Sequence, residues 1–340
     1  MDLKKTTIVA AVAAGMLAAY APASAKTSLL FNIFVPPKHL IRAAIAEGWI
    51  KRVEAASWGE ISVRIPGKTL APAPRQWGMV TDGIADVTIM YNVFERRRLT
   101  LIQMSYLPFN IPSAKAAGVA LWRTHKKHFE KANQFKGVKL LGFFYLPPGA
   151  IHSLGKPIAK VSDFQGLKVR VSPGTPAKFA EAMGGVPVPT PGIKAYEVVS
   201  KGVVDAMLFP PSDTYSLKMV PFVKHTVLVP GGAYGASFSL FMNQKKFDGL
   251  SDAEKAAVMA SSGEKIAEDG VAMDKLNQVG LDALKKNGAT ISTADAAFMA
   301  EAKKRMEFLT KAWLADAKKA GVDGQAALDF YRAEAEKANK

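Results

Sequence analysis

The fold is decided by residues 166–211, GLKVRVSPGTPAKFAEAMGGVPVPTPGIKAYEVVSKGVVDAMLFPP. Alternating apolar side chains predict a strand over residues 169–171, and the Thr-Pro pair that follows is typical of a helix start. A double glycine then ends that helix. After a proline-broken loop over residues 186–191, the pattern predicts a second short helix over 193–200 and a strand over 203–209. This order of elements is typical of an α/β protein.

Arg170 is unusual because it lies inside the first predicted strand, between apolar neighbours. The strand points toward the N-terminus of the helix that opens at Pro176. A guanidinium beside free helix N–H groups can bind a carboxylate, because both hold a planar anion by directed hydrogen bonds. The alternative is an arginine at a strand edge that faces water.

The order GLKVRV, a small-residue loop and helix, GGVPVP, a tyrosine-containing helix and GVVDA resembles the solute-binding protein of a TRAP (tripartite ATP-independent periplasmic) transporter. The match is specific around Arg170 and extends more loosely over the rest of the chain. In that family the arginine at this position pairs with the carboxylate of the bound solute. The resemblance implies an α/β, two-lobe periplasmic-binding-protein-like fold of type II, with a long helix spanning both lobes and the ligand in the cleft between them.

The N-terminus has the three parts of a secretory signal peptide. Lys4 and Lys5 precede an apolar run over residues 8–20, and Ala-Ser-Ala ends at Ala25. We therefore expect a signal peptide over residues 1–25, cleaved after export to the periplasm. The chain has no cysteine, which excludes disulfides, thiolate metal sites and a cysteine nucleophile.

The net charge of +16 favours acidic ligands or an anionic surface. The lysines and arginines are dispersed through the predicted helices, and no nucleic-acid-binding motif is present. We expect no nucleic acid partner, no cofactor and no metal. The expected partners are a small organic carboxylate and the TRAP membrane permease subunits, and the protein is expected to be a monomer.

An internal echo supports two similarly built lobes. VTDGIADVTIM (80–90) and VSKGVVDAMLF (199–209) share the pattern V-x-x-G-[IV]-x-D followed by apolar residues. Asp86 and Asp205 occupy matching places, and a structural role as turn caps explains both. The predicted units are the signal peptide (1–25), lobe 1 (26–148 and 236–270) and lobe 2 (149–235 and 271–340).

A capping box at Ser251 begins an alanine-rich helix that is expected to continue toward Lys286. A helix of about 35 residues is roughly 50 Å long at 1.5 Å per residue, so it predicts the element that spans both lobes. The rest of the chain predicts two further helices, over residues 295–320 and 325–338.

The predicted pocket has fewer polar groups than those of related sugar-acid binders. The resemblance places Phe209 where such relatives have a polar residue, and Ile151 close to where many have a second arginine. Sugar hydroxyls would go unpaired here at roughly 1 to 3 kcal/mol each, so an aromatic or other apolar monocarboxylate fits better. The candidate ligand-binding residues are Arg170, His152, Phe209, Tyr91, His39 and Phe238, with His39 or His152 contacting a second oxygen.

Three alternatives stay open. A C4-dicarboxylate or 2-oxo acid is possible if Lys194 supplies a second positive charge. A binding protein of an ABC or sensory system is a near alternative. An exported hydrolase is the alternative from another class, although the GASFS segment ending at Ser239 lacks the second glycine of a nucleophile elbow.

Overall fold

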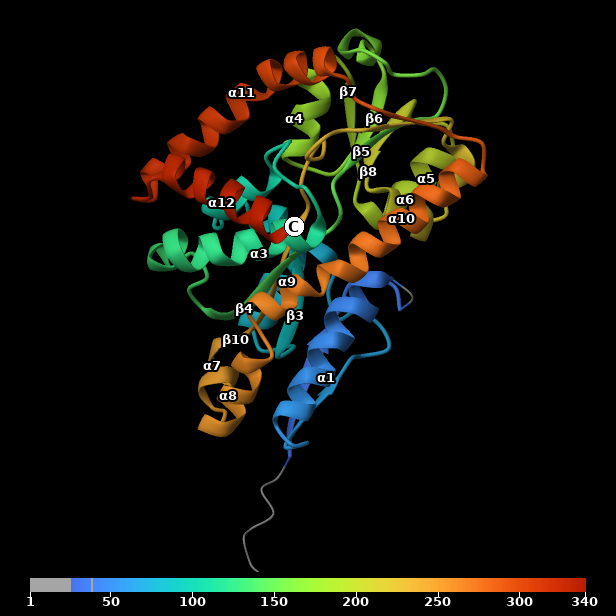
Figure 1. Cartoon of the computed structure of the whole chain (residues 1–340). Coiled ribbons are helices and arrows are strands. Elements are labelled where there is room, and N and C mark those ends of the chain that lie inside the picture. Colours follow the sequence, from blue (N-terminus) through green and yellow to red (C-terminus); the bar gives the residue numbers. More distant parts are fainter. Residues whose placement is uncertain (1–25, 38) are drawn as a thin grey trace, which may run out of the picture.

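The computed structural model describes residues 26–37 and 39–340. These residues form two lobes, each built on one β-sheet with helices around it (Figure 1). The predicted two-lobe α/β fold is confirmed. The predicted signal peptide lies outside the described residues. None of the helices in the described part of the chain is both long and apolar enough to span a membrane.

The first lobe contains a five-stranded sheet in the order β2-β1-β3-β10-β4. β1 pairs in parallel with β2 and β3, whereas β10 is antiparallel to β3 and β4. The strands are β1 (Thr27–Asn32), β2 (Ile61–Arg64), β3 (Val87–Tyr91), β4 (Val138–Tyr145) and β10 (Ser237–Asn243). The principal helices of this lobe are α1 (Glu47–Ala56), preceded by a π-helical turn η1 (Ile41–Ala46), α2 (Gln76–Thr81), α3 (Ala114–Thr124), α7 (Gln244–Asp248) and α8 (Asp252–Ala260).

The second lobe contains a six-stranded sheet in the order β11-β9-β5-β8-β6-β7. Its strands are β5 (Ala150–Ser153), β6 (Lys168–Val171), β7 (Val186–Pro189), β8 (Ala206–Phe209), β9 (His225–Leu228) and β11 (Thr290–Thr293). Its helices include α4 (Thr175–Ala182), α5 (Ala195–Ser200) and α6 (Pro211–Ser216). The predicted strands and helices of residues 166–211 are therefore present, with one addition.

That addition is β7, which lies where a proline-broken loop was predicted. β7 pairs in parallel with β6, with Val186 opposite Lys168 and Pro189 opposite Val171. Proline has no N–H to donate, so it is tolerated only where one side of a strand needs no partner. β7 is the edge of the sheet and meets this condition, so the prediction of a loop was wrong.

The aspartates of the repeated pattern V-x-x-G-[IV]-x-D play the same structural role in both lobes. In the first lobe a carboxylate oxygen of Asp86 accepts a hydrogen bond from the backbone N–H of Leu30 at 2.7 Å. In the second lobe Asp205 accepts the N–H of Lys168 at 2.8 Å. Each aspartate, just before its own strand, thus bonds the backbone of the parallel neighbouring strand, which agrees with the predicted structural role.

Two connections between the lobes run side by side. One links β4 to β5, and the other returns from β9 to β10. They are joined by backbone hydrogen bonds from Leu146 to Ala236 at 3.0 Å and from Ala233 to Gly149 at 2.8 Å. This paired crossing holds the sheets next to one another.

The predicted long helix is interrupted. The chain forms α8, then α9 (Glu264–Glu268) and α10 (Gly270–Lys286), instead of one helix of about 35 residues. The break coincides with Gly263, whose φ of +73° is left-handed and cannot continue a helix. α10 still contacts both lobes, since it packs against α3 and against α6 and runs from one half of the molecule to the other in Figure 1.

α10 packs against α3 and α6 at two glycines, where the backbones come very close to one another. A Cβ on Gly270 would lie 2.7 Å from the backbone nitrogen of Lys115, and one on Gly280 would lie 2.2 Å from the carbonyl oxygen of Pro211. Asp274 also accepts the N–H of Ala114 at 2.7 Å, at the start of α3. On the second lobe, Asn277 accepts the N–H of Ser212 at 3.2 Å.

The two C-terminal helices are α11 (Ala296–Lys319) and α12 (Gly324–Ala338). The predicted boundary places all of residues 271–340 in the second lobe. α12 instead makes its main contact with α3 of the first lobe, and Tyr331 donates a hydrogen bond to the hydroxyl of Tyr145 on β4. α11 contacts elements of both lobes, including α4. The chain therefore returns to the first lobe at its C-terminal end.

Candidate functional site

A cavity of about 90 Å³ lies between the lobes. One water needs roughly 10 to 15 Å³, so the cavity has room for a ligand of several heavy atoms. Both lobes contribute to its wall, which is largely apolar. The aromatic side chains that line it are Phe34, Tyr91, Phe94, Phe209, Tyr234 and Phe238. The predicted wall residues Tyr91, Phe209 and Phe238 are thus brought together.

Arg170 lies on β6, buried directly behind this wall. Its guanidinium donates to the carbonyl oxygens of Thr190 and Leu208, and its Nε has no partner among the described residues. An arginine has five N–H donors, so these two bonds leave donors for an anion. Arg170 does not itself line the cavity; it stacks on Phe209, which does. Burial lowers the pKa of Arg170 to about 10, and the group stays charged at neutral pH.

The position of Arg170 differs from the sequence-based expectation in one respect. The expectation placed the guanidinium beside the free N–H groups at the start of α4, whereas it donates to carbonyl oxygens that follow β7 and lie in β8. The strand was predicted, and the burial of Arg170 removes the alternative of an arginine at a strand edge that faces water. A cation held by carbonyl oxygens is fixed in place and still carries its full charge.

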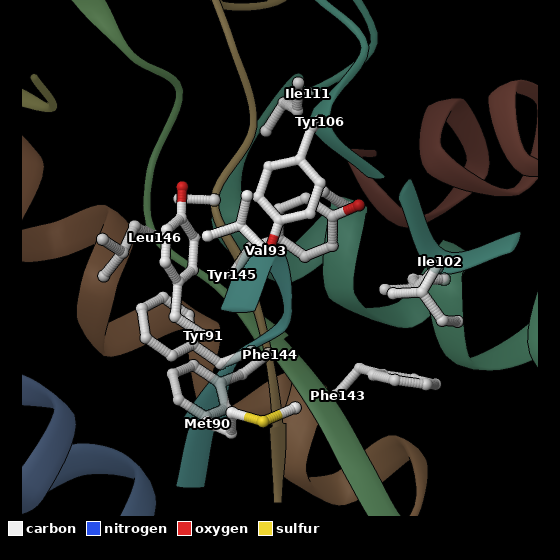
Figure 2. Close-up of a cluster of buried hydrophobic side chains, with 14 of the residues drawn as sticks. Met90, Tyr91, Val93, Ile102, Tyr106, Ile111, Phe143, Phe144, Tyr145 and Leu146 are labelled. Atoms are coloured by element: carbon white, nitrogen blue, oxygen red, sulfur yellow. The ribbon is translucent and has the colours of Figure 1, made fainter. Parts of the chain in front are cut away.

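The first-lobe side of the cavity is an aromatic stack. Phe238 of β10 lies parallel to Phe144, with ring centres 5.0 Å apart, and is tilted against Tyr91 at the same separation. Figure 2 shows Tyr91, Phe144 and Leu146 within this buried cluster. The Tyr91 hydroxyl is buried without a hydrogen-bond partner among the described residues. Burial raises the pKa of Tyr91, so the hydroxyl is neutral and can donate.

His39 lines the cavity as predicted, from the segment before η1. Its Nδ1 accepts the backbone N–H of Ile41 at 3.2 Å, which directs the ring. Burial lowers the pKa of His39 to about 4, so the ring is neutral at physiological pH. A neutral imidazole with Nδ1 as acceptor carries its proton on Nε2 and can donate one hydrogen bond.

His152 is not among the lining side chains. It is buried on β5, where Nδ1 lies 2.9 Å from the Thr226 hydroxyl and Nε2 lies 3.1 Å from the carbonyl oxygen of Phe209. Both ring nitrogens are therefore used inside the second lobe. His152 is therefore packed within the second lobe and lies outside the proposed site.

Asp213 and Tyr234 line the cavity but were missed from sequence. Asp213 follows the Phe-Pro-Pro segment that was interpreted only as apolar wall, and an acidic residue just after a buried strand was the available signal. Tyr234 packs so closely on Gly149 that a Cβ there would lie 2.2 Å from its ring. Burial raises the pKa of Asp213 to about 7, and Arg170 partly opposes this shift.

This chain is similar to several known proteins in sequence and in structure. A 33% identical protein of Comamonas testosteroni, named "Outer membrane transporter protein TsaT", matches over 91% of both chains. A TRAP periplasmic solute-binding protein from Bordetella bronchiseptica, solved with bound (R)- and (S)-mandelate, superposes with a TM-score of 0.87 at 31% identity, covering 92% of this chain and 99% of that one.

A second solved structure is a marine metagenome TRAP solute-binding protein specific for aromatic acid ligands, in complex with 3-hydroxybenzoate. It has a TM-score of 0.85 and 29% identity, and the match covers 93% of this chain and 100% of that one. The family model described as "Bacterial extracellular solute-binding protein, family 7" matches residues 31–316. This chain therefore belongs to family 7 of the bacterial extracellular solute-binding proteins, the DctP family.

Proposed function

We propose that this protein captures a small aromatic or other apolar monocarboxylate in the interlobe cavity and delivers it to the membrane permease of a TRAP transporter. One observation carries the proposal: an aromatic cavity lies against a single buried guanidinium with unused donors. Arg170 neutralises one carboxylate, while the apolar wall excludes water from the ring.

Relatives of similar sequence support the same ligand class. The proteins of known structure at 31% and 29% identity hold mandelate and 3-hydroxybenzoate. Each of these is an aromatic ring with one carboxylate. We infer from this agreement that the ligand of the present chain has the same two parts.

Closure of the lobes is the proposed mechanism. Phe238 and Tyr91 belong to the first lobe, whereas Phe209 and Leu217 belong to the second. A ligand that contacts both walls binds the closed state more tightly than the open one and so shifts the population toward closure. The permease then recognises the closed protein.

A dicarboxylate is less well supported. Among the described residues none of the lining side chains is a lysine or arginine, and Lys194 is exposed outside the cavity. A second carboxylate would face Asp213, and no lysine or arginine of the described cavity wall would neutralise it.

We also propose that the protein acts as a monomeric binding protein and not as an enzyme. Release of product from aryl esters by the purified protein would favour the hydrolase alternative.

Export is part of the proposal. The three-part N-terminus supports cleavage after Ala25, so the intact mass of the periplasmic protein is expected to match a chain that begins at Lys26. Recovery of the full-length chain from the membrane fraction would contradict this.

The ligand class is tested by a thermal-shift screen of aromatic acids, dicarboxylates, 2-oxo acids and sugar acids, with mass spectrometry of any co-purified ligand. A ligand at a hundred times its Kd adds about 2.7 kcal/mol to the free energy of unfolding, which raises the melting temperature measurably. Shifts with benzoate-like acids support the proposal. Shifts with sugar acids or dicarboxylates alone would overturn the proposed ligand class.

A further inference from the structure

The carboxyl group of Asp213 lines the cavity and accepts no hydrogen bond from the described residues. The residue is 6% exposed, lies on α6 and lines the cavity. Among the described residues no hydrogen bond reaches its carboxyl oxygens, and no ion pair within 4.0 Å joins it to Arg170. A largely buried carboxyl that accepts no hydrogen bond from the protein is available to accept one from a ligand in the cavity.

The groups around Asp213 come from several elements. Tyr91 of β3, Tyr234 of the crossing segment and His39 share the cavity with it, and Arg170 of β6 lies behind the wall. α10, which packs on α6, presents the Asn277 side chain to the backbone of Ser212. Arg170 is therefore the one opposite charge in the described residues that acts on Asp213.

Unpaired hydrogen-bonding groups of two kinds thus lie in the cavity wall and directly behind it. Arg170 Nε is a buried donor that lacks an acceptor, and the Tyr91 hydroxyl also lacks a partner. Asp213 is an acceptor that lacks a donor. A ligand that offered only a carboxylate would satisfy the guanidinium and leave Asp213 unpaired. A ligand with a carboxylate and a separate hydroxyl would satisfy both.

We propose that Asp213 is a specificity residue, which accepts a hydrogen bond from a hydroxyl group of an aromatic acid whose carboxylate is bound by Arg170. The inference rests on the proposed function and narrows it to hydroxylated aromatic monocarboxylates. It also disfavours dicarboxylates, since a second ligand carboxylate would meet the like charge of ionised Asp213. The apolar remainder of the wall limits the number of hydroxyls that can be paired.

The test measures affinities of the full mature chain by calorimetry at about pH 8, where Asp213, with a pKa of about 7, is mostly ionised. The probes are benzoate, the three hydroxybenzoates, mandelate, phenylacetate and the three methoxybenzoates. A methoxy group is similar in position to a hydroxyl but has no proton to donate. At least one hydroxylated acid is expected to bind about ten- to a hundredfold more tightly than both its parent and its methoxy counterpart, as a hydrogen bond to a charged group predicts.

Two variants assign that preference to Asp213. Asp213→Leu removes the acceptor at similar size, and the ratio of affinities for the hydroxylated acid and its parent is expected to fall to about one. Asp213→Asn keeps a weaker, neutral acceptor and is expected to retain part of the ratio. Asp248→Asn, at an exposed site on α7, is the matched control and is expected to keep the wild-type ratio.

Because both affinities in the ratio are measured on the same protein, a substitution that weakens binding of all acids equally leaves the ratio unchanged. Equal binding of hydroxylated, methoxy and parent acids by the wild type would overturn the inference and leave the proposed function intact. A wild-type ratio in folded Asp213→Leu, or in Asp213→Asn if the leucine variant does not fold, would also overturn it. If none of these acids bound at all, the proposed function would fail and this inference with it.

Discussion

The guanidinium carbon of Arg170 lies 4.0 Å from the centre of the Phe209 ring. The predicted carboxylate-binding cation and the predicted aromatic wall are therefore in direct contact. A cation over a ring is stabilised by about 2 kcal/mol when the pair is shielded from water. Phe209 consequently does two things at once, since it forms part of the cavity wall and helps to hold the charge behind it.

Replacing Arg170 is expected to abolish most of the affinity. Removing one member of a buried charge pair costs on the order of 2 to 5 kcal/mol, so Arg170→Ala should weaken carboxylate binding tens to thousands of fold. Arg170→Lys should also weaken it, because an ammonium lacks the planar fork. Calorimetry with the best ligand of the screen measures both, with Arg64→Ala at an exposed strand position as control. Wild-type affinity in Arg170→Ala would refute the assignment.

Replacing Phe209 tests the contact with Arg170. Phe209→Leu keeps an apolar wall but removes the ring, and we expect roughly a tenfold loss of affinity for aromatic acids from lost ring and cation contacts. The apolar monocarboxylate hexanoate, which has no ring to stack, should lose less. An equal loss for both ligands would argue that the substitution merely loosens the cavity.

The ionisation of Asp213 predicts how stability depends on pH. Its pKa is raised to about 7, compared with about 3.9 for an unfolded aspartate. Between these values the folded state keeps a proton that the unfolded state has released, so the free energy of unfolding of the wild type falls as pH rises through this range. Asparagine does not titrate. The stability of ligand-free Asp213→Asn relative to the wild type should therefore increase by up to about 4 kcal/mol between about pH 4 and pH 8.

Urea unfolding of both proteins at several pH values measures this difference. The exposed Asp248→Asn substitution controls for the loss of a surface carboxylate. A stability difference that is constant over the range would mean that Asp213 ionises like an ordinary aspartate.

The crossing of α10 over α6 predicts a steric effect at Gly280. A Cβ at this position would lie 2.2 Å from a backbone oxygen, so Gly280→Ala should destabilise the protein by about 1 to 3 kcal/mol despite the higher helix propensity of alanine. Gly155→Ala, where a Cβ meets nothing within 4 Å, is the control. Equal melting temperatures for the two variants would contradict the close approach.

The sequence predicted the parts of the fold that depend on local patterns. A lone arginine between apolar strand residues identified Arg170, and the repeated glycine-aspartate turns identified Asp86 and Asp205. The proline-rich segment over β7 was missed because an edge strand tolerates prolines only by virtue of its place in the sheet. That place depends on residues far away in the chain.

The site was harder to predict than the fold for the same reason. His152 and Asp213 are both polar residues beside apolar strands, yet one bonds within its lobe and the other faces the cavity. Which way each side chain points depends on Thr226 and on the opposite lobe. No spacing in the sequence contains that information.

The two glycine contacts of α10 have a consequence for motion of the lobes. Gly270 contacts the first lobe and Gly280 the second, and the two glycines are ten residues apart, which is about 15 Å along the helix. A straight helix that is packed against both lobes cannot keep both contacts if the lobes move apart. In the proposed closure mechanism, opening must break the contact of α10 with one lobe or bend α10 between the two contacts, and this free energy enters the equilibrium between the open and the closed state. The affinity for solute is thus adjustable at a helix crossing that no solute touches.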